Sequence, residues 1–330
     1  MKQSTERPTV TFEQLTYSNM LTLNALVELL TEKGRVEQSR SPRACEKAPG
    51  RNEGDRMTKL RIPTAAPLGR LGLALAAAVA LFCPLRAVFG WGHEGHAVVA
   101  LLAEHYMTPA AVTRADDLLG GNTIDSVASW ADDYRHDHPE TGPWHYIDIP
   151  LADSKIDLAR ECPNGDCVIA KTEQFLAVLK DPKADRAAKA EALRYVVHFV
   201  ADLHQPLHDE DDGDKGGNAR HVIFDGRPDN LHWVWDTGLL EHINRNPEAL
   251  AAELESHITP QEHEEWTQGT IEDWVLEGHR LAEAVAYGDL GSENPAPITP
   301  AYERQADPVI ELQLEKAGVR LADLLNEDLR

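Results

Sequence analysis

Apolar residues recur at helical spacing over most of the chain from residue 91 onward. Spacings of three and four residues indicate amphipathic helices with one buried face. On this basis we predict helices at 97–107, 167–180, 190–204, 230–243, 247–257, 271–287 and 308–329. Two short segments, 145–150 and 221–224, are predicted as strands. Since no linker divides this region, we predict one mainly α-helical domain over 91–330, with one or two short β-hairpin strands.

A different pattern precedes this region. Residues 57–90 combine a basic start with a 15-residue apolar run at 71–85 and small residues just before Trp91. This is typical of a cleaved secretory signal peptide, and a membrane-spanning helix needs about 20 apolar residues. An uncleaved membrane anchor is the alternative. Residues 1–56 precede what looks like a natural start and are predicted to be a non-native or disordered extension. We therefore expect a secreted or periplasmic protein that begins at Trp91.

The distribution of charge divides the chain at the same place. The 330 residues include 32 Lys and Arg and 55 Asp and Glu, for a formal net charge of −23. Residues 1–90 carry +5 and residues 91–330 carry −28. With 42% hydrophobic and 26% charged residues, the composition excludes a polytopic membrane protein. The acidic balance also disfavours a protein that reads nucleic-acid sequence, because such a protein needs a basic face.

Two cysteines remain after residue 90. Cys162 and Cys167 lie five residues apart in ECPNGDC, which suits a small loop closed by a disulfide in an oxidising compartment. Two thiolate metal ligands are the alternative. We favour the disulfide because residues 91–330 contain no further cysteine to complete a thiolate site.

Histidine and aspartate recur four residues apart in two predicted helices. The pairs are His198 with Asp202 and His232 with Asp236, and this spacing places both side chains on one helix face, where they can share a metal. Imidazole and carboxylate ligands without thiolate favour zinc, although manganese and iron use similar groups. Further candidate ligands are the Trp91 amine, His96, Asp132, His145 and His208.

Taken together, these motifs resemble those of a known family. In order along the chain occur WGHEGH (91–96), SWADDYR (129–135), WHYID (144–148), HFVADLHQPLH (198–208), GGN (216–218) and NLHWVWD (230–236). This series is similar to that of the secreted zinc-dependent single-strand-specific nucleases and 3′-nucleotidases, the fungal-type S-one/P-one nucleases, of which we expect a bacterial member. The resemblance spans residues 91 to about 326. It implies a phospholipase C/nuclease-like helical fold that holds three Zn²⁺ ions.

The resemblance implies a ligand set for each zinc ion. The first ion would be bound by Asp132, His145, His198 and Asp202. The second would be bound by His208, His232 and Asp236. The third would be bound by the amine and carbonyl of Trp91, by His96 and by Asp202, which would bridge two ions. His204 is expected to have a structural role. We expect surface or packing roles for His93, His105, His136, His138, His221, His242, His257, His263 and His279.

The resemblance also implies roles in catalysis and substrate binding. A hydroxide between two zinc ions would attack phosphorus in line with the leaving O3′, because zinc lowers the pKa of bound water from about 15.7 to about 7. Arg135 would stabilise charge on the phosphate. Tyr146 would stack on the base and Asp148 would hydrogen-bond it. The catalytic residues are thus Asp132, Arg135 and Asp202, and the substrate-binding residues are Tyr146, Asp148 and Asn218.

The function implied is an endonuclease for single-stranded DNA and RNA that also acts on 3′-nucleotides. One alternative is a zinc-dependent phospholipase C, which shares the trinuclear site and would hydrolyse phosphatidylcholine. The other is a non-catalytic zinc-binding protein, although the dispersed histidines disfavour zinc storage. We expect no stable protein partner, and no membrane association after the signal peptide is cleaved.

Overall fold

The computed structural model describes residues 91–288 and 290–330, so the predicted extension and signal peptide at 1–90 lie outside the described residues. The α-helices are α3 (His93–Tyr106), α4 (Pro109–Leu118), α5 (Trp130–Asp137), α6 (Leu158–Glu161), α7 (Val168–Lys180), α8 (Arg186–Asp202), α9 (Leu231–Trp233), α10 (Leu239–Ile243), α11 (Pro247–Glu255), α12 (Pro260–Trp266), α13 (Ile271–Leu281) and α14 (Pro300–Asp328). Shorter helical turns are η1 (Asp125–Val127), η2 (Pro139–His145), η3 (Pro163–Gly165), η4 (Pro206–His208), η5 (Val234–Gly238) and η6 (Ala282–Tyr287). The strands are β1 (His221–Phe224), β2 (Arg227–Asn230) and β3 (Ala296–Pro297).

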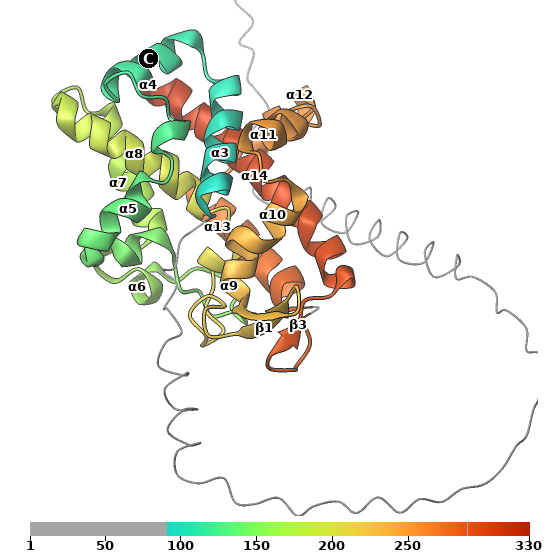
Figure 1. The fold of residues 1–330 in the computed structure, drawn as a ribbon. Coiled ribbons are helices and arrows are strands. Elements are labelled where there is room, and N and C mark those ends of the chain that lie inside the picture. Colours follow the sequence, from blue (N-terminus) through green and yellow to red (C-terminus); the bar gives the residue numbers. More distant parts are fainter. Residues whose placement is uncertain (1–90, 289) are drawn as a thin grey trace, which may run out of the picture. The chain divides into compact units, whose positions relative to one another are not determined.

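Packed helices build the core, with α3 and α14 side by side (Figure 1). Gly318 permits their close approach, because a Cβ there would lie 2.4 Å from the Cβ of Leu102. Helix α11 packs on α3, and α7 packs on α8. Near the end of α14, the Asn326 side chain accepts a hydrogen bond from the Thr108 amide and donates one to the Tyr106 carbonyl. The fold is therefore mainly helical, as predicted. None of the helices in 91–288 and 290–330 is long and apolar enough to cross a membrane.

Helix α8 carries two of the predicted metal ligands at its buried end. It begins after Asp185, whose side chain accepts a hydrogen bond from the Ala188 amide at 2.8 Å and so caps the helix. Every residue from Tyr195 to Asp202 is buried. A helix that is buried on all sides lies within the core, and α8 therefore places its last two turns in the interior of the domain.

The small sheet confirms one strand prediction. Strand β1 coincides with the predicted strand at 221–224, pairs antiparallel with β2 as a hairpin and pairs parallel with β3. The order in the sheet is β2-β1-β3.

The predicted strand at 145–150 is wrong. This segment comprises the end of η2, extended backbone and one isolated bridge between Pro150 and Asp211. Ile147 and Ile149 do alternate inward, as the sequence pattern requires. The Ile147 amide donates to the His208 carbonyl, and the Asp211 amide donates to the Ile149 carbonyl. No continuous ladder forms between these two described segments because η4 turns the facing backbone.

Six of the seven predicted helices are present, most of them with shifted ends. The helix predicted at 97–107 begins at His93, and the one predicted at 308–329 begins at Pro300. The segment predicted as one helix at 230–243 is instead the end of β2 followed by α9, the π-helical turn η5 and α10. The apolar pattern does not predict α4 or α12. Both begin with a threonine cap followed by proline, the capping signal that would have found them.

Candidate metal centre

Histidine and aspartate side chains that are distant in sequence converge inside the domain. Three groups each offer three ligand atoms that lie within 4.8 Å of one another, and all their members are buried. The groups are His96 with His198 and Asp202, Asp132 with His145 and His198, and His208 with His232 and Asp236. Every His and Asp predicted as a ligand therefore belongs to one of these groups.

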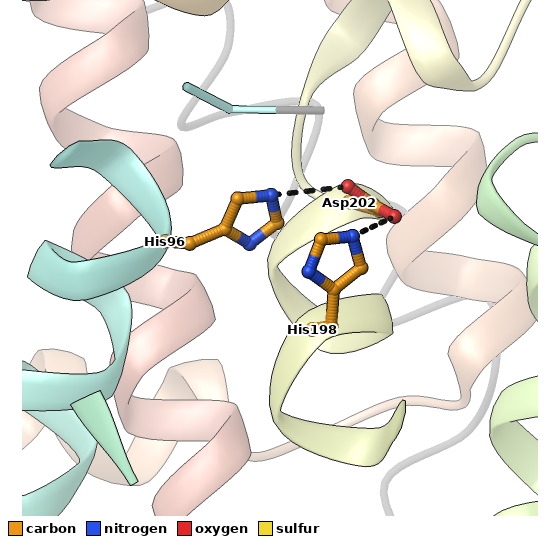
Figure 2. A group of neighbouring side chains, drawn as sticks. All are labelled: His96, His198 and Asp202. Atoms are coloured by element: carbon orange, nitrogen blue, oxygen red, sulfur yellow. Dashed lines mark ion pairs between the residues drawn. The ribbon is translucent and has the colours of Figure 1, made fainter. Parts of the chain in front are cut away.

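The carboxylate of Asp202 lies between two of the groups. Its Oδ2 is 2.9 Å from Nδ1 of His145 and 3.2 Å from Nε2 of His198. Its Oδ1 is 3.5 Å from Nε2 of His96. Figure 2 shows His96 reaching this carboxylate from α3 and His198 reaching it from α8. Asp202 is thus close to histidines of both groups; its bridging of two ions stays a prediction.

Backbone carbonyls orient three of the imidazoles. Nδ1 of His198 lies 2.7 Å from the Ala128 carbonyl, and Nδ1 of His208 lies 2.8 Å from the His145 carbonyl. Nδ1 of His232 lies 2.5 Å from the Gly216 carbonyl. Because a carbonyl only accepts, each Nδ1 carries the proton. In the neutral form of each ring, Nε2 then has a lone pair, the arrangement found in metal-binding histidines.

Several buried polar atoms in the cluster have no hydrogen-bond partner in the described part of the chain. They include Oδ1 of Asp132 and Asp202 and Nε2 of His145, His208 and His232. A buried polar group without a partner costs about 1–3 kcal/mol. Bound divalent cations would satisfy these atoms, and imidazole and carboxylate ligands suit zinc. The chemistry of these residues therefore fits bound metal ions, for which three groups of side chains are candidates.

Asp132 joins the cluster to Arg135. Oδ1 of Asp132 lies 3.7 Å from Nε2 of His198 and 3.9 Å from Nδ1 of His145. Nη2 of Arg135, three residues along α5, lies 3.4 Å from the same oxygen. Burial raises the pKa of Asp132 to about 7, against the opposing charges of His198 and Arg135. Helix α5 thus places a guanidinium directly beside the candidate metal ligand Asp132.

Asp202 and His198 each stabilise the charged form of the other. Burial alone would raise the pKa of Asp202, but His198 and hydrogen bonds from His145 and His198 hold this pKa well below its usual range. Burial would lower the pKa of His198, but Asp202 and Asp132 raise it to about 9. A histidine ligand must be deprotonated to bind a metal, so metal binding at His198 would release a proton.

Gln205 is a residue of the site that the sequence analysis misses. Its side-chain amide donates to Oδ1 of Asp236 at 2.5 Å, and its carbonyl oxygen accepts from the Leu207 amide at 2.7 Å. The other oxygen of Asp236 then lies 3.1 Å from Nε2 of His232. The only signal in the sequence is that Gln205 lies between two predicted ligands, Asp202 and His208.

Trp91 lies buried next to the His232 group. The Gly92 amide donates to the Asp236 carbonyl at 2.8 Å, which anchors this start of the described chain. Close packing requires Gly95, because a Cβ there would lie 2.7 Å from the Cβ of Trp91. In the 330-residue chain the Trp91 nitrogen is bonded to Gly90, so its predicted role as a free amine ligand requires cleavage.

A cavity of about 720 Å³ opens beside the candidate metal ligands. Two ligand candidates, His208 and His232, line it. The same wall contains the residues predicted to act on the phosphate and the base: Arg135, Tyr146, Asp148 and Asn218. His136, for which we expected a surface or packing role, also lines the cavity.

Asp148 and Asn218 are held differently at this cavity. Burial, followed by the charge of Asp211, raises the pKa of Asp148 to about 6. The backbone and side-chain amides of Asn218 both donate to the Lys215 carbonyl, at 3.2 Å and 2.8 Å. Asp148 therefore changes protonation state near neutral pH, whereas Asn218 also stabilises the turn that contains it.

The disulfide Cys162–Cys167 is present, with an S–S distance of 2.06 Å. The alternative that these cysteines are thiolate metal ligands is therefore wrong. Cys167 precedes α7, and the next residue, Val168, donates its amide to the Tyr146 carbonyl at 3.1 Å. The disulfide loop thus adjoins the backbone that positions Tyr146 at the cavity.

His204 has both ring nitrogens engaged away from the cluster. Nδ1 lies 2.7 Å from the Val200 carbonyl, and Nε2 lies 2.8 Å from Nη1 of Arg320. Nη2 of Arg320 also donates to Glu277 at 2.9 Å. His204 thus belongs to a buried network between α8, α13 and α14, which agrees with a structural role.

Comparisons with known proteins agree with this geometry. A model of the S1/P1 nuclease family matches residues 91–330. The chain is 34% identical to nuclease P1 of Penicillium citrinum over 273 residues, covering 72% of this chain and 97% of that protein. It is 29% identical to nuclease S1 of Aspergillus oryzae, covering 80% and 98%. It is 27% identical to endonuclease 1 of Arabidopsis thaliana, covering 77% and 92%. The protein therefore belongs to the S1/P1 nuclease family.

Proposed function

We propose that this protein is a secreted, zinc-dependent phosphodiesterase that hydrolyses single-stranded DNA and RNA and removes phosphate from 3′-nucleotides. The observation that carries the proposal is one shared cavity, in which His208 and His232 face the same space as Arg135, Tyr146 and Asp148. Metal ligands, a phosphate-binding cation and a base-binding wall are the parts that this reaction needs.

The metal ligands divide into three sites in this proposal. Asp132, His145, His198 and Asp202 hold the first ion, and His208, His232 and Asp236 hold the second. The Trp91 amine and carbonyl, His96 and Asp202 hold the third. When bound, zinc ions polarise phosphate oxygens and make a coordinated water acidic near neutral pH.

The remaining residues position the substrate. A water oxygen bonds to phosphorus while the P–O3′ bond breaks, and O3′ takes up a proton, so the products are a 5′-phosphate and a 3′-hydroxyl. Arg135 donates hydrogen bonds to the phosphate oxygens as charge builds up on them. Tyr146 stacks on the base, Asp148 hydrogen-bonds its edge, and Asn218 lines the same site.

The surface charge supports a preference for single strands. Residues 91–330 carry a net charge of −28, which weakens nonspecific binding to the dense phosphates of a duplex. Stacking on Tyr146 requires a base that can leave its neighbours, as bases in a flexible single strand can. We therefore propose that binding energy comes mainly from the cavity.

Secretion is part of the same proposal. Residues 57–90 would act as the signal peptide, and cleavage after Gly90 would release the Trp91 amine to bind metal. Residues 1–56 would be absent from the mature protein. Export also agrees with the Cys162–Cys167 disulfide, because disulfides persist in oxidising compartments.

The proposal is tested with the exported protein and a panel of substrates. We expect cleavage of denatured DNA and RNA, slower cleavage of duplex DNA, phosphate release from adenosine 3′-phosphate, and recovery of activity when zinc is restored after chelation. N-terminal sequencing should begin at Trp91. Hydrolysis of phosphatidylcholine with inert denatured DNA would instead establish a phospholipase, and bound zinc without any hydrolysis would establish a binding protein.

A further inference from the structure

Lys215 lines the cavity without a role in the site described above. Among the described residues, the wall of this cavity contains one arginine, Arg135, and one lysine, Lys215. Arg135 lies beside the metal ligand Asp132, whereas Lys215 lies in the exposed loop between η4 and β1. The cavity therefore has a second cationic side chain, away from the atoms that act on the scissile phosphate.

The backbone around Lys215 is fixed to the metal centre. The Lys215 amide donates to Oδ1 of Asp211 at 2.8 Å, and φ of Lys215 is 63°, in the left-handed region. The carbonyl of the next residue, Gly216, is the group that orients Nδ1 of His232. A Cβ on Gly216 would lie 2.6 Å from the Leu207 carbonyl, so the backbone at Gly216 packs closely against Leu207. The Lys215 side chain thus starts one residue from a contact with a candidate metal ligand.

Three acidic residues near Lys215 in the sequence contact other groups. The Tyr287 hydroxyl, with one hydrogen to donate, lies 2.8 Å from Oε1 of Glu210 and 2.9 Å from Oδ1 of Asp214. Oδ1 of Asp211 accepts from backbone amides of the loop. Within 91–288 and 290–330, the Lys215 ammonium forms no ion pair. A flexible cation at the cavity wall is therefore available to an anionic ligand.

We propose that Lys215 binds a second phosphate of the substrate strand, next to the phosphate at the metal centre, and so favours polynucleotides over mononucleotides. This inference rests on the proposed function. A lysine ammonium is a compact charge that pairs well with phosphate. A 3′-nucleotide has only the phosphate that reacts, whereas a strand has another on each side of the scissile bond. Lys215 would therefore contribute only with the longer substrate.

Dinucleotides with and without a terminal phosphate test this inference. The substrates are dithymidine monophosphate and its 5′-phosphorylated and 3′-phosphorylated forms. The measurement is kcat/KM for cleavage of the internal bond, taken from initial rates before the proposed 3′-nucleotidase activity removes the 3′-phosphate. In the zinc-loaded wild-type enzyme, a terminal phosphate on one of the two sides should raise kcat/KM. This gain should fall about threefold to tenfold in Lys215→Ala and Lys215→Gln and persist in Lys215→Arg. The side that shows the gain identifies the phosphate.

Two controls separate this contact from a general charge effect. Lys183→Ala removes the same charge from an exposed position outside the cavity wall and should keep the gain. With oligothymidylate, Lys215→Ala should also lower the salt slope of log kcat/KM by about 0.7, the value for one phosphate contact on a single strand.

The outcomes distinguish this inference from the proposed function. An active wild-type enzyme that gains nothing from a terminal phosphate, or a gain that survives in Lys215→Ala, would overturn the role of Lys215 alone. An equal loss in Lys183→Ala would also overturn it. A zinc-loaded wild-type enzyme that cleaves none of these substrates, nor denatured DNA, would contradict the proposed function as well.

Discussion

Gln205 holds the carboxylate of Asp236 through a hydrogen bond of 2.5 Å, although the two residues lie 31 positions apart in the sequence. The bond fixes one carboxylate oxygen and leaves the other beside His232. Partners of this kind orient metal ligands and typically contribute a factor of 10 to 100 in metal affinity.

Gln205→Leu should therefore weaken one zinc site selectively. We expect about 10-fold to 100-fold lower affinity at the His208, His232 and Asp236 site, measured by competition with a chromophoric chelator. Added zinc should restore activity. Gln261→Leu, on the exposed surface of α12, is the matched control. Unchanged affinity at every site in a folded Gln205→Leu protein would contradict this role.

Asp211 should set the pH dependence of base binding through Asp148. Burial and the charge of Asp211 raise the pKa of Asp148 to about 6 from its ordinary 3.8. If ionised Asp148 accepts a hydrogen bond from the base, KM should rise as the pH falls below about 6. Asp211→Asn removes one cause of the raised pKa while its Oδ1 still accepts from the loop amides, so the rise should move to lower pH.

The measurement is the pH profile of KM for adenosine 3′-phosphate. Asp212→Asn removes an equal charge from the neighbouring exposed residue and should leave the inflection in place. Asp148→Asn should abolish it. An inflection near pH 6 that persists in Asp148→Asn would show that another group causes it.

Glu277 should stabilise the fold above acidic pH. Burial would raise its pKa, but Arg320 and Lys316 hold the pKa at about 2, against an ordinary value of 4.5. A carboxyl whose pKa is depressed by folding adds stability above the unfolded pKa, and this stability is lost as the pH falls toward the folded pKa. Removing one partner of a buried ion pair costs about 3–5 kcal/mol.

We therefore expect Glu277→Gln to lower the free energy of unfolding by about 3 kcal/mol above pH 5. The difference from wild type should shrink steadily between about pH 4.5 and pH 2. Urea unfolding at a series of pH values measures it, with the exposed Glu272→Gln as control. A difference that stays constant down to pH 3 would show that the charge of Glu277 is not responsible.

Periodicity and i/i+4 spacing are local properties of the chain, so the sequence alone predicts the helical class and the two His–Asp pairs. The convergence of ligands from separate segments is implied only by the resemblance to a known family. His198 and Asp202 share a helix face whatever surrounds them. The pairing of 145–150 is not local. Its alternation places Ile147 and Ile149 correctly, but the partner segment turns at Pro206, which no pattern within 145–150 reveals.

Two other features are not predicted from the sequence, for related reasons. Helix α12 has no buried residue, so hydrophobic periodicity cannot find it, and its Thr259–Glu262 capping box is the remaining signal. Gln205 contacts Asp236, and Lys215 lines the cavity, only after the chain has folded, so the roles that we propose for them depend on the tertiary structure. A side chain that orients a metal ligand has no fixed distance from that ligand in the sequence, so no spacing pattern reveals it.

The zinc count of the exported protein, measured by native mass spectrometry, tests the central claim most directly. Wild-type protein beginning at Trp91 should hold three zinc ions. Asp202→Asn should hold at most one firmly, because Asp202 lies between the His96 and the His145 groups, each within 3.5 Å. A wild-type protein that is fully active with fewer than three ions, or an Asp202→Asn protein that retains all three, would contradict the account.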